Sequence, residues 1–160
     1  SMVFWDEVFA AVAADYPDIA HEQQLIDSLA ARFVTRPASL DVVVCSNLFG
    51  DILTDLGAAI SGSLGLAPSA NLNPDRRYPS LFQAIHGSAP DIAGRGIANP
   101  VATIWSTSLL LRHLGEREAA DQLMTAIETV LATGQTLTPD LGGTATTVAM
   151  GDAIRAALPA

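Results

Sequence analysis

The spacing of apolar residues along this chain predicts several helices. Residues 21–34 place apolar side chains three and four positions apart, which is typical of the buried face of an amphipathic helix. Residues 116–133 show the same spacing, with Ala119, Ile127 and Val130 among the side chains expected in the core. In all, we expect helices over residues 5–14, 21–34, 50–60, 100–114, 116–133 and 147–158.

Two short segments predict strands. Residues 41–46 form a continuous run rich in valine, as expected for a strand buried on both faces of a parallel sheet. Residues 81–85 are a second candidate, whereas the Pro- and Asn-rich segment 68–79 is expected to be a long loop. The pattern is therefore α/β, with too few strands for a complete sheet. Either the fold is mostly helical or the sheet needs strands from elsewhere.

Composition and charge narrow the class of protein. The chain has 160 residues, of which 49% are hydrophobic, and this is enough apolar material for a folded core. Seventeen acidic residues against eight basic ones give a net charge of −9, which argues against nucleic acid or an anionic membrane as a partner. Cys45 has no second cysteine to pair with, and no run reaches the roughly 18 apolar residues of a membrane span. We therefore expect a cytoplasmic protein.

Two carboxylates, Asp51 and Asp55, lie four residues apart shortly after the apolar run 41–46. On a helix, residues at this spacing project from the same face about 6 Å apart, so the two side chains could share one cation. Hard carboxylate oxygens suit Mg²⁺ or Mn²⁺. The alternative is that both are acids near a helix N-terminus, favoured there by the helix dipole.

The segment 86–100, which reads HGSAPDIAGRGIANP, is rich in turn-forming residues and predicts a tight loop able to cradle a ligand. Asn99 is expected to cap the following helix, with Pro100 at its first position. Other roles are open for individual residues. His86 could pack within the loop, and Asp91 could cap a turn.

Three long motifs carry a resemblance to a known family. They are NLFGDILTDLGAAISGSLGL at 47–66, PSANLNP at 68–74 and the loop at 86–100. They resemble the β-decarboxylating dehydrogenases, which include isopropylmalate and isocitrate dehydrogenases, and they are most similar to the tartrate/D-malate branch. The resemblance covers essentially the whole chain. It implies the C-terminal portion of the isopropylmalate/isocitrate dehydrogenase fold, α/β, with an incomplete sheet and about six helices.

The resemblance also implies that the chain contains parts of two domains. Residues 1–66 correspond to part of a metal-binding and dimerisation domain, and residues 67–160 to part of an NAD-binding domain. In such enzymes Mg²⁺ or Mn²⁺, chelated by a 2-hydroxy acid, is held by two aspartates of one helix, here Asp51 and Asp55. A third aspartate comes from the partner subunit, and Asp27 is its counterpart, although Asp27 could instead be a solvated helix residue.

The cofactor implied by the resemblance is NAD. The implied NAD-contacting residues are His86, Gly87, Ser88, Ala89, Asp91 and Asn99. An anionic Asp91 would accept hydrogen bonds from ribose hydroxyls and repel a 2′-phosphate, so NAD is favoured over NADP.

The sequence departs from the family pattern in two ways that bear on catalysis. Gln83 stands where members usually carry an acid, and the sequence contains no lysine, whereas the family uses a lysine as general base. Members of the family are longer, and their upstream half supplies that lysine, a tyrosine and the arginines that clamp the substrate. We therefore expect the chain alone to be inactive.

Two hypotheses follow. In the first, the chain is the C-terminal part of an NAD- and Mg²⁺/Mn²⁺-dependent oxidoreductase that oxidises and decarboxylates a 2-hydroxy acid once the missing half completes it. In the second, it is a non-catalytic module that pairs with itself or with a full-length relative. The second would use the apolar residues Ile52, Leu56, Ala59 and Ile60.

Overall fold

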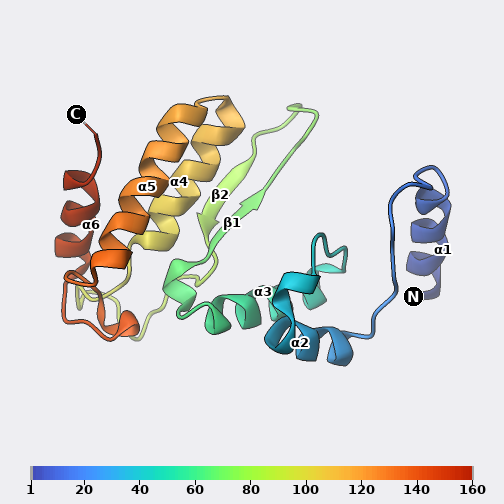
Figure 1. The fold of residues 1–160 in the computed structure, drawn as a ribbon, viewed down its shortest axis with the longest axis horizontal. Coiled ribbons are helices and arrows are strands. Elements are labelled where there is room, and N and C mark those ends of the chain that lie inside the picture. Colours follow the sequence, from blue (N-terminus) through green and yellow to red (C-terminus); the bar gives the residue numbers. More distant parts are fainter. Residues whose placement is uncertain (1, 160) are drawn as a thin grey trace. The chain divides into compact units, whose positions relative to one another are not determined.

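The structure is a computed structural model that describes residues 2–159. The chain forms two compact units, which divide between Val43 and Val44. Within the described residues there are six α-helices and one two-stranded sheet, so the expected α/β class, helix number and incomplete sheet are confirmed (Figure 1). The functional division expected at residues 66 and 67 stays a prediction. No helix in residues 2–159 combines the length and apolar character needed to cross a bilayer.

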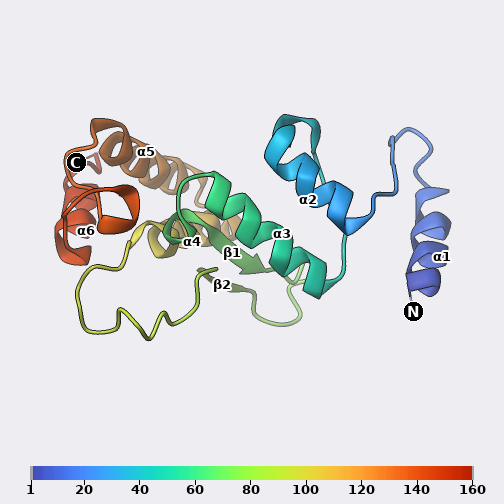
Figure 2. The ribbon, with the colours of Figure 1, turned by 90° about the horizontal axis from the view of Figure 1, so that it is seen from below.

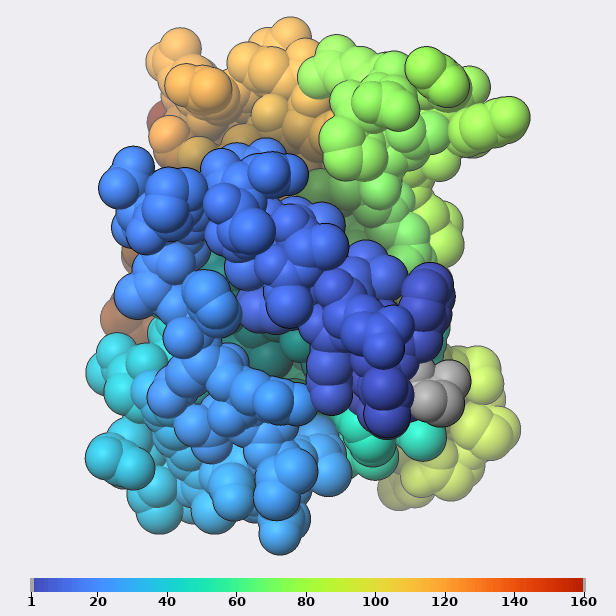
Figure 3. All heavy atoms as spheres, turned by 90° about the vertical axis from the view of Figure 1, so that its right-hand side faces the viewer, coloured from blue at the N-terminus to red at the C-terminus, as the bar shows by residue number. Residues whose placement is uncertain are grey.

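The first unit contains two helices, α1 (Met2–Ala13) and α2 (Ile26–Thr35). None of the residues of α1 is buried, and its atoms lie open at the surface of this unit (darkest blue in Figure 3). The start expected for α2 at residue 21 is wrong, because the backbone is still extended at Leu25, with φ −75° and ψ 146°. Leu29 is the one residue of α2 that is buried.

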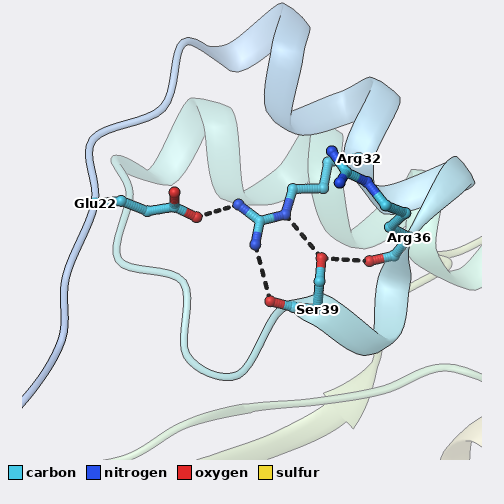
Figure 4. Close-up of polar contacts among 4 residues, drawn as sticks. All are labelled: Glu22, Arg32, Arg36 and Ser39. Carbon is cyan, nitrogen blue, oxygen red and sulfur yellow. Dashed lines mark hydrogen bonds and ion pairs between the residues drawn. The ribbon is translucent and has the colours of Figure 1, made fainter.

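Arg32 of α2 organises the segments on either side of its helix. Its guanidinium pairs with Glu22, and it also donates to the hydroxyl (2.8 Å) and the carbonyl (3.0 Å) of Ser39 (Figure 4). Ser39 in turn donates to the Arg36 carbonyl at 2.7 Å. The hydrogen bond and positive charge of Arg32 lower the pKa of Glu22, whose carboxylate is exposed.

The second unit begins with the helix that carries the two aspartates and ends in three packed helices. Its helices and strands are α3 (Asn47–Ile60), β1 (Pro68–Asn71), β2 (Leu81–Ala84), α4 (Val101–Leu114), α5 (Arg117–Thr133) and α6 (Thr147–Ala156). Single 3₁₀ turns cover Leu64–Leu66 and Pro139–Leu141.

The core of this unit lies among α4, α5 and α6. In Figure 1, α4 and α5 stand between the β-hairpin and α6. The Ser108 hydroxyl donates to the Ala120 carbonyl at 2.9 Å and joins α4 to α5. Ala120 is fully buried, so the expectation that Ala119 faces the core is wrong by one position. The buried cluster consists of Val101, Ala126, Ile127, Val130, Met150 and Ile154.

The sheet is an antiparallel hairpin. Pro68 pairs with Ala84 and Asn71 with Leu81, which confirms the strand expected near 81–85. The expectation that all of 68–79 is loop is wrong, because residues 68–71 form a strand. The sequence does not predict this strand, since none of the four residues is β-branched or aromatic. The Ser106 hydroxyl donates to the Gln83 carbonyl at 2.7 Å and fixes the hairpin to α4.

The strand expected at 41–46 is not present. Val42 is 82% exposed and Val44 is 62% exposed, and the segment pairs with no strand within residues 2–159. A strand buried on both faces needs neighbours on each edge to satisfy its backbone groups. The one sheet of the described residues is the hairpin, so this segment has no such neighbours.

Candidate functional site

Helix α3 presents Asp51 and Asp55 one turn apart, and both residues are exposed. Leu53, on the opposite face of the helix, is buried. Within residues 2–159, no ion pair engages either aspartate. Two hard carboxylates without a cationic partner fit a divalent cation of the Mg²⁺ or Mn²⁺ type.

The position of Asp51 and Asp55 along α3 argues against the alternative that they are acids stabilised by the dipole at the helix N-terminus. The helix begins at Asn47, three residues earlier than expected, so its first turn contains no acid. The stabilisation of acids by the helix dipole falls off within the first turn. Asp51 and Asp55 therefore gain little from the dipole.

The third expected metal ligand, Asp27, lies in the other unit. It occupies the first turn of α2, where its carboxylate accepts the Ser28 amide at 2.8 Å. No group of three or more His, Cys, Asp or Glu side chains comes together among residues 2–159. A ligand set of three aspartates therefore stays a prediction.

The loop between β2 and α4 is a series of turns (yellow-green in Figure 2). Gly87, Gly94 and Gly96 have φ values of 68°, 77° and 66°, and a Cβ added at any of them would meet no atom within 4 Å. Ala89 also has a positive φ, 41°, which is strained for a residue with a side chain. The loop thus offers open backbone to a ligand and holds one residue in an unfavourable conformation.

The side chains of this loop differ in availability. Ser88 and Asp91 are exposed, and His86 is exposed with its Nδ1 2.8 Å from the Gly87 carbonyl oxygen. Asn99 is buried, 7% exposed. Its Oδ1 accepts the Val101 amide at 2.9 Å, so the Asn99 side chain satisfies the first amide of α4. The N-cap position itself is occupied by Pro100, with φ −83° and ψ −8°, one residue later than expected.

A polar cluster that the sequence did not point to surrounds Asp140. Its Oδ2 accepts hydrogen bonds from the Ser63 hydroxyl at 2.5 Å and from the Asn99 amide at 2.9 Å. Gly65 packs so closely that an added Cβ would lie 2.7 Å from the Asn99 Cβ and 2.9 Å from Asp140 Oδ2. The one available signal was the run of turn-forming residues 138–143, which shows a turn but not its contacts.

Comparison with known proteins decides the family of this chain. Residues 1–154 match the family described as isocitrate/isopropylmalate dehydrogenase. The chain belongs to the isocitrate/isopropylmalate dehydrogenase family. Among solved structures, that of isocitrate dehydrogenase from Methylococcus capsulatus superposes with a TM-score of 0.88 at 42% identity, covering 94% of this chain and 44% of that one.

Curated members of the isocitrate/isopropylmalate dehydrogenase family are similar along almost the whole chain. The D-malate dehydrogenase [decarboxylating] of Escherichia coli (strain K12) is 54% identical over 159 residues. The tartrate dehydrogenase/decarboxylase of Pseudomonas putida is 54% identical over 160 residues. Each comparison covers 96% of this chain but 44% of the relative, so the chain spans less than half the length of these proteins. The resemblance to the tartrate/D-malate branch is confirmed.

In this isocitrate/isopropylmalate dehydrogenase chain, the ionisation of Asp140 makes the stability of the fold depend on pH in the acidic range. Burial raises the pKa of Asp140, but hydrogen bonds outweigh it, so its pKa lies below the ordinary value of 3.8. The donors are the side chains of Ser63, Thr138 and Asn99. A lowered folded-state pKa means that the ionised carboxylate stabilises the fold above pH 3.8 and that this contribution is lost as the pH falls further.

We therefore expect Asp140→Asn to lose about 1 kcal/mol or less of unfolding free energy at pH 7, since solvent screens a partly exposed carboxylate. Below the folded-state pKa of Asp140, variant and parent should converge. Urea denaturation across this pH range checks both statements. A stability difference that persists unchanged into strong acid would contradict the assignment.

Proposed function

We propose that this chain supplies metal ligands and the adenosine-binding loop of an NAD- and divalent-metal-dependent dehydrogenase that oxidises and decarboxylates a 2-hydroxy acid of the tartrate or D-malate type. The observation that carries the proposal is the exposed Asp51 and Asp55 pair, beyond the first turn of α3 and free of ion pairs among residues 2–159. The names of the relatives support the chemistry, since they are a D-malate dehydrogenase and a tartrate dehydrogenase/decarboxylase.

Asp51 and Asp55 would hold Mg²⁺ or Mn²⁺, and Asp27 of a second copy would complete the set. A cation bound there supplies Lewis-acid stabilisation of negative charge on a substrate oxygen. The two carboxylates of α3 place two negative charges on one helical face, and the buried Leu53 fixes the rotation of that face. The remaining coordination positions would stay open to the two oxygens of a 2-hydroxy acid.

The loop 86–99 would bind the adenosine half of NAD. Gly87 leaves the backbone open where His86, Ser88 and Ala89 would approach the cofactor. The exposed Asp91 would accept hydrogen bonds from the ribose hydroxyls. Because two hydrogen bonds within the chain already engage the Asn99 side chain, its contact with adenine would use its backbone or its second amide hydrogen.

Proton transfer in this reaction would come from residues outside this chain. There is no lysine among the 160 residues, and Gln83 replaces an ionisable acid with an amide that holds no charge. Gln83 is exposed on β2, and its backbone carbonyl accepts a hydrogen bond from the Ser106 hydroxyl. These residues can bind and orient, but none of them is the general base that the family resemblance implies.

The first test of this function is the activity of the chain alone. With NAD, Mn²⁺ and either D-malate or tartrate, we expect no formation of NADH above the rate of a protein-free control. The physical reason is that positioning of metal and cofactor without a general base leaves the proton of the hydroxyl group in place. Mn²⁺-dependent NADH formation by the purified chain would contradict this expectation.

Calorimetric titration tests the binding part of the proposal. We expect heat of binding for Mn²⁺ and for NAD in separate titrations of the chain. Absence of both would overturn the proposed function.

A second candidate function rests on the exposed apolar side chains of α3. Ile52 is 51% exposed, Ile60 is 45% exposed and Leu48 is 66% exposed. Together with Leu56 and Ala59 they could pair the chain with itself or with a full-length relative, as a non-catalytic module. A monodisperse monomer in light scattering, together with no response to a full-length relative, would exclude this function.

A further inference from the structure

Three segments that are far apart in the sequence meet at the carboxylate of Asp140. Ser63, which follows α3, donates its hydroxyl hydrogen to Oδ2 at 2.5 Å. Asn99, which ends the loop 86–99, donates to the same oxygen at 2.9 Å. Asp140 itself lies in the 3₁₀ turn Pro139–Leu141 that precedes α6. One oxygen atom therefore joins the end of the aspartate-bearing helix to the end of the loop.

The turn after α3 is held closely against Asp140. The Ser63 hydroxyl oxygen also accepts the Gly65 amide at 2.9 Å, so the same group closes the turn after α3 and reaches Asp140. A side chain at Gly65 would collide with Asn99 and Asp140. The turn can approach the other two segments this closely because residue 65 is glycine.

The contact on the loop side is reinforced by α6. The Thr147 amide donates to the Gly96 carbonyl at 2.8 Å, and its hydroxyl donates to the Ala98 carbonyl at 2.5 Å. The Asn99 side chain accepts the Val101 amide through Oδ1 and donates to Asp140 through Nδ2. The last residues of the loop are thus held from two sides, and Asp140 is the link to α3.

We infer that Asp140 is a positioning residue that sets the loop 86–99 against the turn after α3. The inference rests on the proposed function, in which α3 carries metal ligands and the loop carries the NAD contacts. The Asp140 carboxylate would then hold the two half-sites in register without touching metal or cofactor. Its charge strengthens both hydrogen bonds relative to neutral acceptors.

Amide hydrogen exchange measured by NMR on the 160-residue chain tests the inference directly. In Asp140→Ala, exchange should accelerate about tenfold or more at two separated amides, those of Gly65 and Val101. Asp140→Asn keeps an oxygen that can accept both hydrogen bonds but lacks the charge, so it should restore much of the protection. Asp152→Ala is the matched control, since Asp152 is an exposed acid paired with Arg155 on α6; it should change neither amide.

The outcomes separate the inference from the proposed function. Acceleration at both amides with recovery in Asp140→Asn supports positioning, and acceleration confined to residues 138–143, or equal in both variants, overturns it. If Asp140→Ala does not fold, Ser63→Ala is used instead, because it removes only the hydrogen bond between Ser63 and Asp140. This variant should accelerate exchange of the Val101 amide, and an unchanged Val101 rate overturns the inference. NAD titration of the parent chain is read separately. A parent that does not bind NAD defeats the proposed function, whereas the exchange data still decide the role of Asp140.

Discussion

Replacing Asp51 and Asp55 together by asparagine is expected to lower the affinity of the chain for Mn²⁺ by at least about 100-fold. The loss of outer partners of a metal ligand already changes affinity by about 10- to 100-fold, so loss of two charged ligands should exceed this range. Asparagine keeps the shape of each side chain and removes the charge. The variant should fold normally, since both residues are exposed and unpaired within the described chain.

The measurement is Mn²⁺ titration followed by electron paramagnetic resonance, which counts free metal. The matched control replaces two other exposed aspartates, Asp75 and Asp152, by asparagine and so changes the net charge equally. We expect the control to bind Mn²⁺ as the parent does. Equal losses in both double variants would show that overall charge, and not the α3 pair, attracts the metal.

The second large effect is expected for Gly143→Ala, which should cost about 3 kcal/mol of unfolding free energy or prevent folding. A Cβ at this position would lie 1.9 Å from the carbonyl oxygen of Leu137 and 2.5 Å from its carbonyl carbon. The backbone has little room to yield, since the Gly143 amide bonds the Thr138 carbonyl at 3.1 Å and the Ala145 amide bonds the Leu137 carbonyl at 2.9 Å.

Urea denaturation of Gly143→Ala is best compared with that of Gly151→Ala. Gly151 lies within α6, and a Cβ added there meets no atom within 4 Å. Alanine at this site should stabilise the chain by about 0.5–1 kcal/mol through helix propensity alone. If Gly143→Ala is as stable as the parent, the turn 138–143 is not packed as the structure has it.

Local signals made the helices of the second unit predictable. The start of α4 follows from Asn99 and Pro100, and its end and that of α5 follow from Gly115 and Gly134, whose φ values are 99° and 65°. These residues act on their own helix termini, so their effect is visible in the sequence. The late start of α2 was not visible, because residues 21–24 contain no Pro or Gly to mark a boundary and Leu25 already belongs to the apolar stripe, although its backbone is extended.

Strands were less predictable because they depend on partners. Ser69, Ala70 and Asn71 form β1 only because residues 81–83 lie opposite them. Val42 and Val44 have the composition of a strand but no partner within the described residues. Strand propensity is a statement about packing on a sheet, and it fails where the sheet is absent.

The candidate site divides in the same way. The placement of Asp51 and Asp55 one turn apart on one helix was predictable because four-residue spacing is a local property, whereas their role as metal ligands stays a prediction. The contacts of Asp140 with Ser63 and Asn99 span 77 and 41 positions in the sequence, and tertiary packing alone brings them together. The roles of His86, Asp91 and Asp27 rest on the family resemblance and stay predictions.

A chimera tests the account most directly. In it, this chain replaces the matching region of the Escherichia coli D-malate dehydrogenase, to which it is 54% identical. We predict that the folded chimera forms NADH from D-malate in a Mn²⁺-dependent manner, and that changing Asp51 and Asp55 to asparagine abolishes this activity. A folded chimera without activity, or one whose activity survives both substitutions, would contradict the assignment of α3 as the metal-binding helix of a decarboxylating dehydrogenase.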